Sequence, residues 1–174
     1  GPEEQLQLTQ NTQPAILTVS YSIFKVMKTE FDINFNTFKY FAGHSLGEYS
    51  ALVCSESLAI NDALYLLHER GKAMQAAVPV GKGSMIAVLG LKIKEIKDIL
   101  NKYKDVKGIC EIANDNADGQ VIISGNKESI QSLQSFLKDK KIKSIPLKVS
   151  APFHCSMMAP AADVMAEELA AMQI

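Results

Sequence analysis

The sequence has few cysteines, no long apolar run and almost no net charge. Its three cysteines (Cys54, Cys110 and Cys155) are scattered, with no Cys-x-x-Cys pair and no histidine cluster. The sequence therefore predicts reduced thiols of a cytoplasmic protein and neither a disulfide framework nor a zinc site. No apolar stretch approaches the roughly 20 residues of a membrane-spanning helix, and the first residues lack a secretory-signal pattern. A net charge of −1 gives no reason to expect nucleic acid or membrane as a partner.

With 174 residues, the chain is long enough for one domain with a real core, or for one domain plus a small insert. Its most informative stretch is Gly43-His44-Ser45-Leu46-Gly47. The aromatic-rich run 38–42 before it predicts a short buried strand, and residues 46–53 can wind as a helix. A Gly-x-Ser-x-Gly turn between strand and helix is typical of a nucleophile elbow, which exposes a serine hydroxyl. Ser45 is therefore a candidate nucleophile, and the Leu46 N–H is a candidate donor to an oxygen that gains negative charge.

An arginine interrupts the apolar stripe of the next predicted helix, which we expect Asn61 to cap and which runs to about Val78. The stripe recurs at spacings of three and four, at Ala63, Leu67, Arg70, Met74 and Ala77. A guanidinium withdrawn from water needs an anion. Arg70 therefore pairs with a glutamate such as Glu48 or reaches solvent, or it grips a substrate carboxylate through two parallel hydrogen bonds. In the last case Met74, one turn on, would line the same pocket.

Residues 81–149 differ in pattern from the rest of the chain. The expected order is strand 84–89, helix 93–104, strands 108–113 and 120–124, helix 128–138 and strand 142–149, with a turn at 114–119. This β-α-β-β-α-β order predicts a ferredoxin-like insert. The segment holds 13 lysines and 8 acidic residues. Its excess of positive charge would steer an acidic protein partner toward it, unless the lysines only solvate helix faces.

A histidine follows the last predicted strand. His154 lies in the proline-bearing run 149–155, a usual place for a catalytic base, ahead of a helix expected at 160–171. Near the other end, a helix at 11–28 is expected to be capped by Thr12. Its apolar face comprises Ile16, Val19, Ile23, Val26 and Met27. Outside the insert we expect only one strand before the elbow and one near residue 148. A doubly wound sheet needs more, so the chain is expected to be the middle of a larger protein.

Five stretches together resemble the malonyl-CoA:acyl carrier protein transacylases of bacterial type II fatty acid synthesis. They occur in that family's order and spacing and extend over nearly the whole chain. The stretches are Thr12-Gln13-Pro14-Ala15-Ile16, the run 43–52 around the elbow, Arg70-Gly71-Lys72-Ala73-Met74-Gln75, Gly119-Gln120-Val121-Ile122-Ile123-Ser124-Gly125, and 149–158.

The resemblance implies a role for each candidate residue. It makes Ser45 the nucleophile, His154 its general base, Arg70 the ligand of the malonyl carboxylate and Leu46 an oxyanion donor. Phe153 looks like the malonyl-preferring form of its motif. The implied reaction passes the malonyl group of malonyl-CoA through a serine ester to the thiol of acyl carrier protein, without metal or redox cofactor.

The resemblance also implies a fold. It is an α/β hydrolase-like large subdomain (residues 1–80 and 150–174, incomplete here) with a ferredoxin-like small subdomain (81–149). The family places a second oxyanion donor before this chain and a histidine-orienting carbonyl after it, so we expect the piece alone to be weak or inactive. Three alternatives stay open. They are a Ser-His-Asp esterase or thioesterase using Asp115 or Asp118, the acyltransferase domain of a megasynthase, and a non-catalytic docking module for acyl carrier protein.

Overall fold

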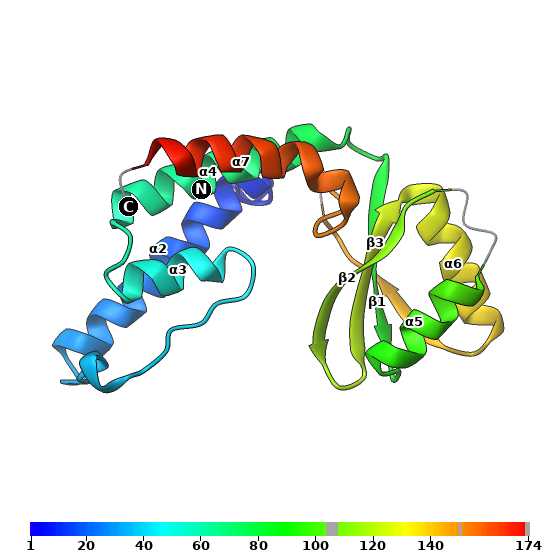
Figure 1. Cartoon of the computed structure of the whole chain (residues 1–174), viewed down its shortest axis with the longest axis horizontal. Coiled ribbons are helices and arrows are strands. Elements are labelled where there is room, and N and C mark those ends of the chain that lie inside the picture. Colours follow the sequence, from blue (N-terminus) through cyan, green and yellow to red (C-terminus); the bar gives the residue numbers. More distant parts are fainter. Residues whose placement is uncertain (104–107, 150, 173–174) are drawn as a thin grey trace. The chain divides into compact units, whose positions relative to one another are not determined.

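A computed structural model describes residues 1–103, 108–149 and 151–172. The chain divides into two compact units (Figure 1). Unit 1 comprises Gly1–Ala73 and Asp163–Ile174, and unit 2 comprises Met74–Ala162. Within the described ranges, no helix combines the length and the apolar character that crossing a membrane requires.

Unit 1 is built from helices. They are α1 (Glu3–Leu6), α2 (Thr9–Thr29), the 3-10 turn η1 (Phe35–Thr37), α3 (Gly47–Cys54), most of α4 (Ile60–Ala77) and the end of α7 (Ala159–Ala171). Leu17 of α2, Val53 of α3, Leu66 and Leu67 of α4 and Met165 of α7 share one buried core. Burial of these side chains holds the helices together, and α3 lies alongside α2 (Figure 1).

The prediction of a strand at 38–42 is wrong. These residues form irregular chain, and no described segment of unit 1 pairs with them. Extended backbone becomes a strand only when a neighbour supplies the ladder hydrogen bonds. Phe38 instead packs on Phe35, with ring centroids 5.3 Å apart, and Phe35 packs on Phe24 of α2, with ring centroids 4.4 Å apart.

Three helix predictions in unit 1 also need correction. Helix α2 begins at Thr9, so its cap is Leu8 and not Thr12, whose hydroxyl donates to backbone carbonyls of the preceding turn. Helix α4 begins at Ile60, one residue before the predicted cap Asn61. Four members of the apolar face predicted for α2 are 44–60% exposed, namely Ile16, Val19, Ile23 and Val26. Periodicity identified a helix, but Leu17 on another side of it is the residue that enters the core.

Unit 2 contains an antiparallel sheet of four strands in the order β2-β3-β1-β4 (Figure 1). Its elements are β1 (Gly83–Leu89), α5 (Ile93–Lys102), β2 (Cys110–Ala117), β3 (Gln120–Asn126), α6 (Lys127–Asp139) and β4 (Lys143–Pro146). The 3-10 turn η2 (Ser156–Met158) then leads into α7. The predicted order of strands and helices is confirmed, while the end of the helix expected at 93–104 falls partly outside the described residues.

The predicted turn at 114–119 is too long. Strand β2 continues to Ala117 through register irregularities at Ile112/Asn114 and Asp115/Ala117, which absorb the polar residues. The reversal needs only two residues, and Gly119 adopts a φ of +81° there. The last strand is also shorter than the predicted 142–149.

The central strands β1 and β3 carry buried side chains on both faces of this sheet. Alternate residues of β1 point to opposite faces: Ile86 and Val88 join the core formed with α5 and α6. Met85 and Ala87 pack on the other face with Ile122, Leu147 and Phe153. The second face therefore carries the segment that leads to His154.

Candidate functional site

The Gly-x-Ser-x-Gly stretch forms a tight turn that enters α3 directly. Ser45 adopts a φ of +55°, in the left-handed region that non-glycine residues seldom occupy. The Gly47 N–H donates to the His44 carbonyl at 2.9 Å, and the Glu48 N–H donates to the Ser45 carbonyl at 3.1 Å. Strained conformations of this kind cluster at active sites because the surrounding structure must hold them in place. The geometry is therefore that of an elbow, even though the strand predicted before it is absent.

The two glycines of the turn have different spatial requirements. A Cβ at Gly43 would lie 1.8 Å from the Gly47 carbonyl oxygen, whereas a Cβ at Gly47 meets nothing within 4 Å. We therefore expect Gly43→Ala to open the turn and cost about 1–3 kcal/mol of unfolding free energy, as overpacking does. Gly47→Ala is the matched control and should be neutral or slightly stabilising, because alanine favours helices. Denaturant titration of both variants tests this, and equal stabilities would contradict the elbow geometry.

Arg70 reaches the candidate nucleophile. Its Nη2 donates to Ser45 Oγ at 3.2 Å, and its Nη1 makes a short hydrogen bond to Gln13 Oε1. No carboxylate in the described ranges, Glu48 included, lies within 4.0 Å of this guanidinium. The alternative prediction of an ion pair between Arg70 and Glu48 is therefore wrong.

The electrostatic surroundings of Arg70 favour the binding of an anion. Burial lowers the pKa of its guanidinium, and the nearby Tyr49 and Glu48 offset this only in part. Burial also raises the pKa of Tyr49, against the effect of the Arg70 charge. A partly buried cation whose hydrogen-bond partners are neutral gains when a carboxylate reaches it, since bidentate charge-assisted bonds are among the strongest in proteins.

The side chain of Gln13, for which the sequence predicted no role, contacts Arg70. It is only 4% exposed, and its Nε2 donates to Thr9 Oγ1 at 2.9 Å while its Oε1 accepts from Arg70. Helices α2 and α4 approach each other closely at this point. A Cβ placed on Gly71 of α4 would lie 2.3 Å from the Gln10 Cα of α2. The signal that could have found Gln13 was its spacing of four from the buried Leu17, which puts both on one helix face.

Leu46 provides a backbone donor beside Ser45. It is the N-cap of α3, and its N–H donates to no acceptor in the part of the chain that the structure describes. Amides at a helix amino end carry partial positive charge. The Leu46 N–H is thus suited to an oxyanion on a carbonyl attacked by Ser45.

The remaining predicted site residues belong to unit 2. Met74 of α4 is 7% exposed, and the ring of Phe153 packs on the sheet face. His154 adopts a φ of +57° in the loop between β4 and η2. The structure thus groups Ser45, Leu46 and Arg70 in unit 1 and places Met74, Phe153 and His154 in unit 2. The catalytic and binding roles assigned to these residues remain predictions.

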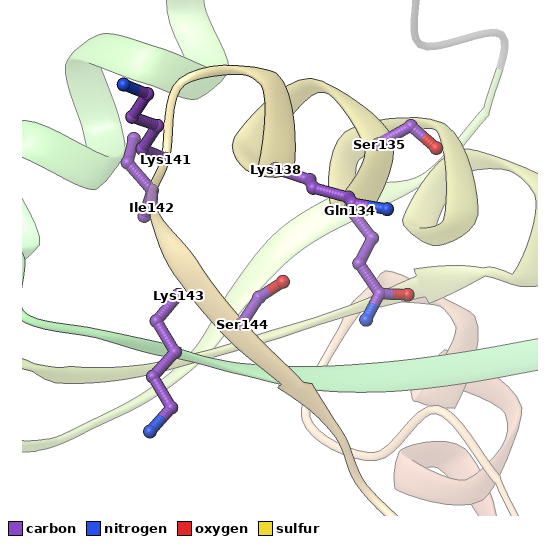
Figure 2. A pocket seen from close by; sticks show the side chains of 7 residues that line it. All are labelled: Gln134, Ser135, Lys138, Lys141, Ile142, Lys143 and Ser144. Atoms are coloured by element: carbon purple, nitrogen blue, oxygen red, sulfur yellow. The ribbon is translucent and has the colours of Figure 1, made fainter.

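A separate hollow of about 470 Å³ lies between α6 and β4 (Figure 2). Three lysines, Lys138, Lys141 and Lys143, stand around it. Their side chains point in different directions and do not converge on one point (Figure 2). Such a rim suits an extended acidic surface better than a single small anion.

The three cysteines are unpaired. Cys54, Cys110 and Cys155 are all free thiols, and burial raises the pKa of Cys110 to about 11. Across the described residues, no three His, Cys, Asp or Glu side chains are grouped as a metal ion requires.

Comparison with known proteins yields a consistent set of relatives. Residues 1–174 match the family described as "Acyl transferase domain". The malonyl CoA-acyl carrier protein transacylase of Bacillus subtilis (strain 168) is 41% identical over 175 residues, which is 100% of this chain and 54% of that protein. The crystal structure of FabD from Acinetobacter baumannii superposes with a TM-score of 0.90 at 42% identity, over 97% of this chain and 53% of that one.

A third similar structure is described as a type II PKS acyl-carrier protein in complex with its malonyl-transacylase. It has a TM-score of 0.90 and 40% identity, over 99% of this chain and 55% of that one. The chain therefore spans about half the length of the relatives it matches.

Proposed function

Because the chain belongs to the family of acyl transferase domains, we propose that its protein transfers a malonyl group from malonyl-CoA to the phosphopantetheine thiol of acyl carrier protein. One observation carries this proposal: among the described residues the hydrogen-bond partners of the Arg70 guanidinium are the neutral side chains of Gln13 and Ser45. A cation placed beside a nucleophile favours an acyl group that ends in a carboxylate. The malonyl group has this chemistry, and the named relatives are malonyl transacylases.

In the first step, Ser45 Oγ attacks the thioester carbonyl of malonyl-CoA while His154 takes the hydroxyl proton as general base. The carbonyl oxygen becomes an oxyanion, and the Leu46 N–H donates to it. The carbon–sulfur bond then breaks, and the departing sulfur of CoA receives the proton from His154. A malonyl ester of Ser45 remains.

The second step repeats the first in reverse with a different thiol. His154 takes the proton of the phosphopantetheine thiol as its sulfur attacks the ester carbonyl, and the proton passes to Ser45 Oγ as the ester bond breaks. Each step is a proton transfer coupled to acyl exchange, so we propose no metal or redox cofactor. The basic rim at Lys138, Lys141 and Lys143 supports an acidic protein as the second substrate.

Arg70 supplies the selectivity of this scheme. A malonyl carboxylate satisfies the guanidinium, whereas an acetyl group leaves it without an anion in a partly desolvated place. Sites built around a hydrogen-bonding group reject analogues that lack the partner by roughly 10⁴-fold. Met74 and Phe153 are proposed to shape the acyl pocket.

The proposal extends to the fold and the location of the protein. The β-α-β-β-α-β order with strand order β2-β3-β1-β4 supports a ferredoxin-like small subdomain at 81–149. Residues 1–80 and 150–174 would belong to a large subdomain related to α/β hydrolases, as the elbow supports. Three free thiols fit a reducing, cytoplasmic compartment.

The esterase alternative has less support. A catalytic acid should be sheltered so that it can orient the histidine. Asp115 and Asp118 are both exposed, and Asp118 lies 3.7 Å from Lys92 Nζ. An esterase also leaves the position of Arg70 unexplained.

The proposed function is tested by mixing the protein with malonyl-CoA and holo acyl carrier protein and measuring the mass of the carrier protein by mass spectrometry. We expect malonyl-carrier to form faster than malonate is released to water. Malonate release without carrier loading would support the esterase alternative. Binding of the carrier without any acyl exchange would support the docking module.

A further inference from the structure

The loop that carries His154 is tied to strand β2 by a carboxylate. The Ser156 N–H donates to Glu111 Oε2 at 2.6 Å, and the Ser156 hydroxyl donates to Glu111 Oε1 at 2.7 Å. Both carboxylate oxygens of Glu111 thus accept hydrogen bonds from Ser156, which lies 45 positions later in the chain. Hydrogen bonds to an ionised acceptor are about twice as strong as neutral ones.

The position of Ser156 makes this tie relevant to His154. Ser156 is the first residue of η2, which runs directly into α7, and it lies two positions after His154. The first amides of a helical segment lack internal partners and favour a negative charge. Glu111 lies near the start of β2, where it pairs with Ser124 of β3, so its backbone belongs to the sheet.

The other side of His154 is held to the same sheet. Pro152 is fully buried, and a Cβ at Gly83 of β1 would lie 2.2 Å from its Cγ. The Phe153 ring packs on the sheet face. His154 therefore lies between an apolar anchor on its amino side and the Glu111–Ser156 hydrogen bonds on its carboxyl side.

The backbone of His154 requires such support. A φ of +57° is costly for a residue with a side chain and persists only where the surroundings over-determine it. Releasing Ser156 would let residues 154–156 relax, and the imidazole would turn away from the direction that this backbone gives it. Sequence reasoning had no access to this, because Glu111 and Ser156 are far apart in the chain.

We propose that Glu111 is a positioning residue for His154, which it holds through its two hydrogen bonds to Ser156. This inference rests on the proposed function for the role of His154 as general base. A positioned base contributes roughly 10²–10⁴ to rate, and an unpositioned one forfeits part of that.

The test compares Glu111→Ala, which removes both bonds, with Glu111→Gln, which keeps one acceptor and a similar shape. Glu128→Ala is the matched control, because it removes an exposed glutamate elsewhere in unit 2. We expect Glu111→Ala to lower kcat of acyl transfer about 10- to 100-fold with KM for malonyl-CoA unchanged, within the general-base contribution. Glu111→Gln should recover most of that loss, and Glu128→Ala should match the wild type.

A second measurement follows the environment of the His154 ring by NMR and does not depend on enzyme activity. In histidine-labelled protein, we expect the His154 ring resonance to move toward its random-coil position in Glu111→Ala and the Ser156 amide to exchange faster with solvent. Unchanged resonances and an unchanged kcat in folded Glu111→Ala would overturn the inference. If the wild type transfers no malonyl group, the proposed function fails, and the resonances still decide whether Glu111 positions His154.

Discussion

Replacing Ser45 with alanine is expected to abolish acyl transfer. The variant keeps the turn but has no hydroxyl to form the ester, and loss of a serine nucleophile typically costs on the order of 10⁴ to 10⁶ in kcat. Steady-state loading of acyl carrier protein, followed by peptide mapping of the acylated enzyme, measures the effect. In the wild type, the malonyl group should map to the peptide that contains Ser45.

Ser50→Ala provides the matched control for this variant. Ser50 lies on α3 in the helix that follows the elbow, and its buried hydroxyl has no hydrogen-bond partner among the described residues. Removal of an unpaired buried hydroxyl should not destabilise the helix. We expect Ser50→Ala to retain full activity. Retained transfer in Ser45→Ala, or a malonyl group that maps to another peptide of the wild type, would remove Ser45 as nucleophile.

The second large effect is expected from Arg70→Ala. Without the guanidinium, the malonyl carboxylate loses its partner, and removing one member of a desolvated charge pair costs about 2–5 kcal/mol. At about 1.4 kcal/mol per tenfold, kcat/KM for malonyl-CoA should fall roughly 30- to 4,000-fold. Acetyl-CoA has no carboxylate, so its low rate should stay the same or rise, and the preference for malonyl should largely disappear.

Arg70→Lys separates charge from geometry. Lysine keeps the positive charge but lacks the planar fork that binds Gln13 and Ser45 together with a carboxylate. We therefore expect it to recover only part of the malonyl rate. Competition between malonyl-CoA and acetyl-CoA in one reaction measures the preference directly. Equal losses for both substrates would show that Arg70 serves the fold or the serine and does not select the acyl group.

Local chemistry explains which site features could be predicted from the sequence. The turn at Ser45 depends on glycine at position 43, which the five-residue pattern contains. The position of Arg70 follows from helical spacing, since one polar residue in an apolar stripe must still face inward. Gln13 was missed because its role depends on the close approach of α2 and α4 at Gly71, which a single-helix pattern does not reveal.

The fold was predicted best where the pairing is local. In unit 2 the sheet is completed by strands of the same segment, so alternation and turns sufficed to place β1, β3 and α6. Residues 38–42 have the composition of a strand, but composition cannot supply a pairing partner. The prediction that the apolar face of α2 is buried was wrong for a related reason. The pattern shows that Val19 and Ile23 are apolar, but not what lies next to them.

The central claim is a malonyl ester on Ser45 selected by Arg70, and intact-mass spectrometry of the protein tests it most directly. The protein to which this chain belongs is incubated briefly with malonyl-CoA or with acetyl-CoA, and its mass is measured without further treatment. The account predicts a gain of one malonyl group that requires Ser45 and Arg70, with no comparable gain from acetyl-CoA. An acetyl adduct of equal yield, or a malonyl adduct that persists in Ser45→Ala, would contradict it.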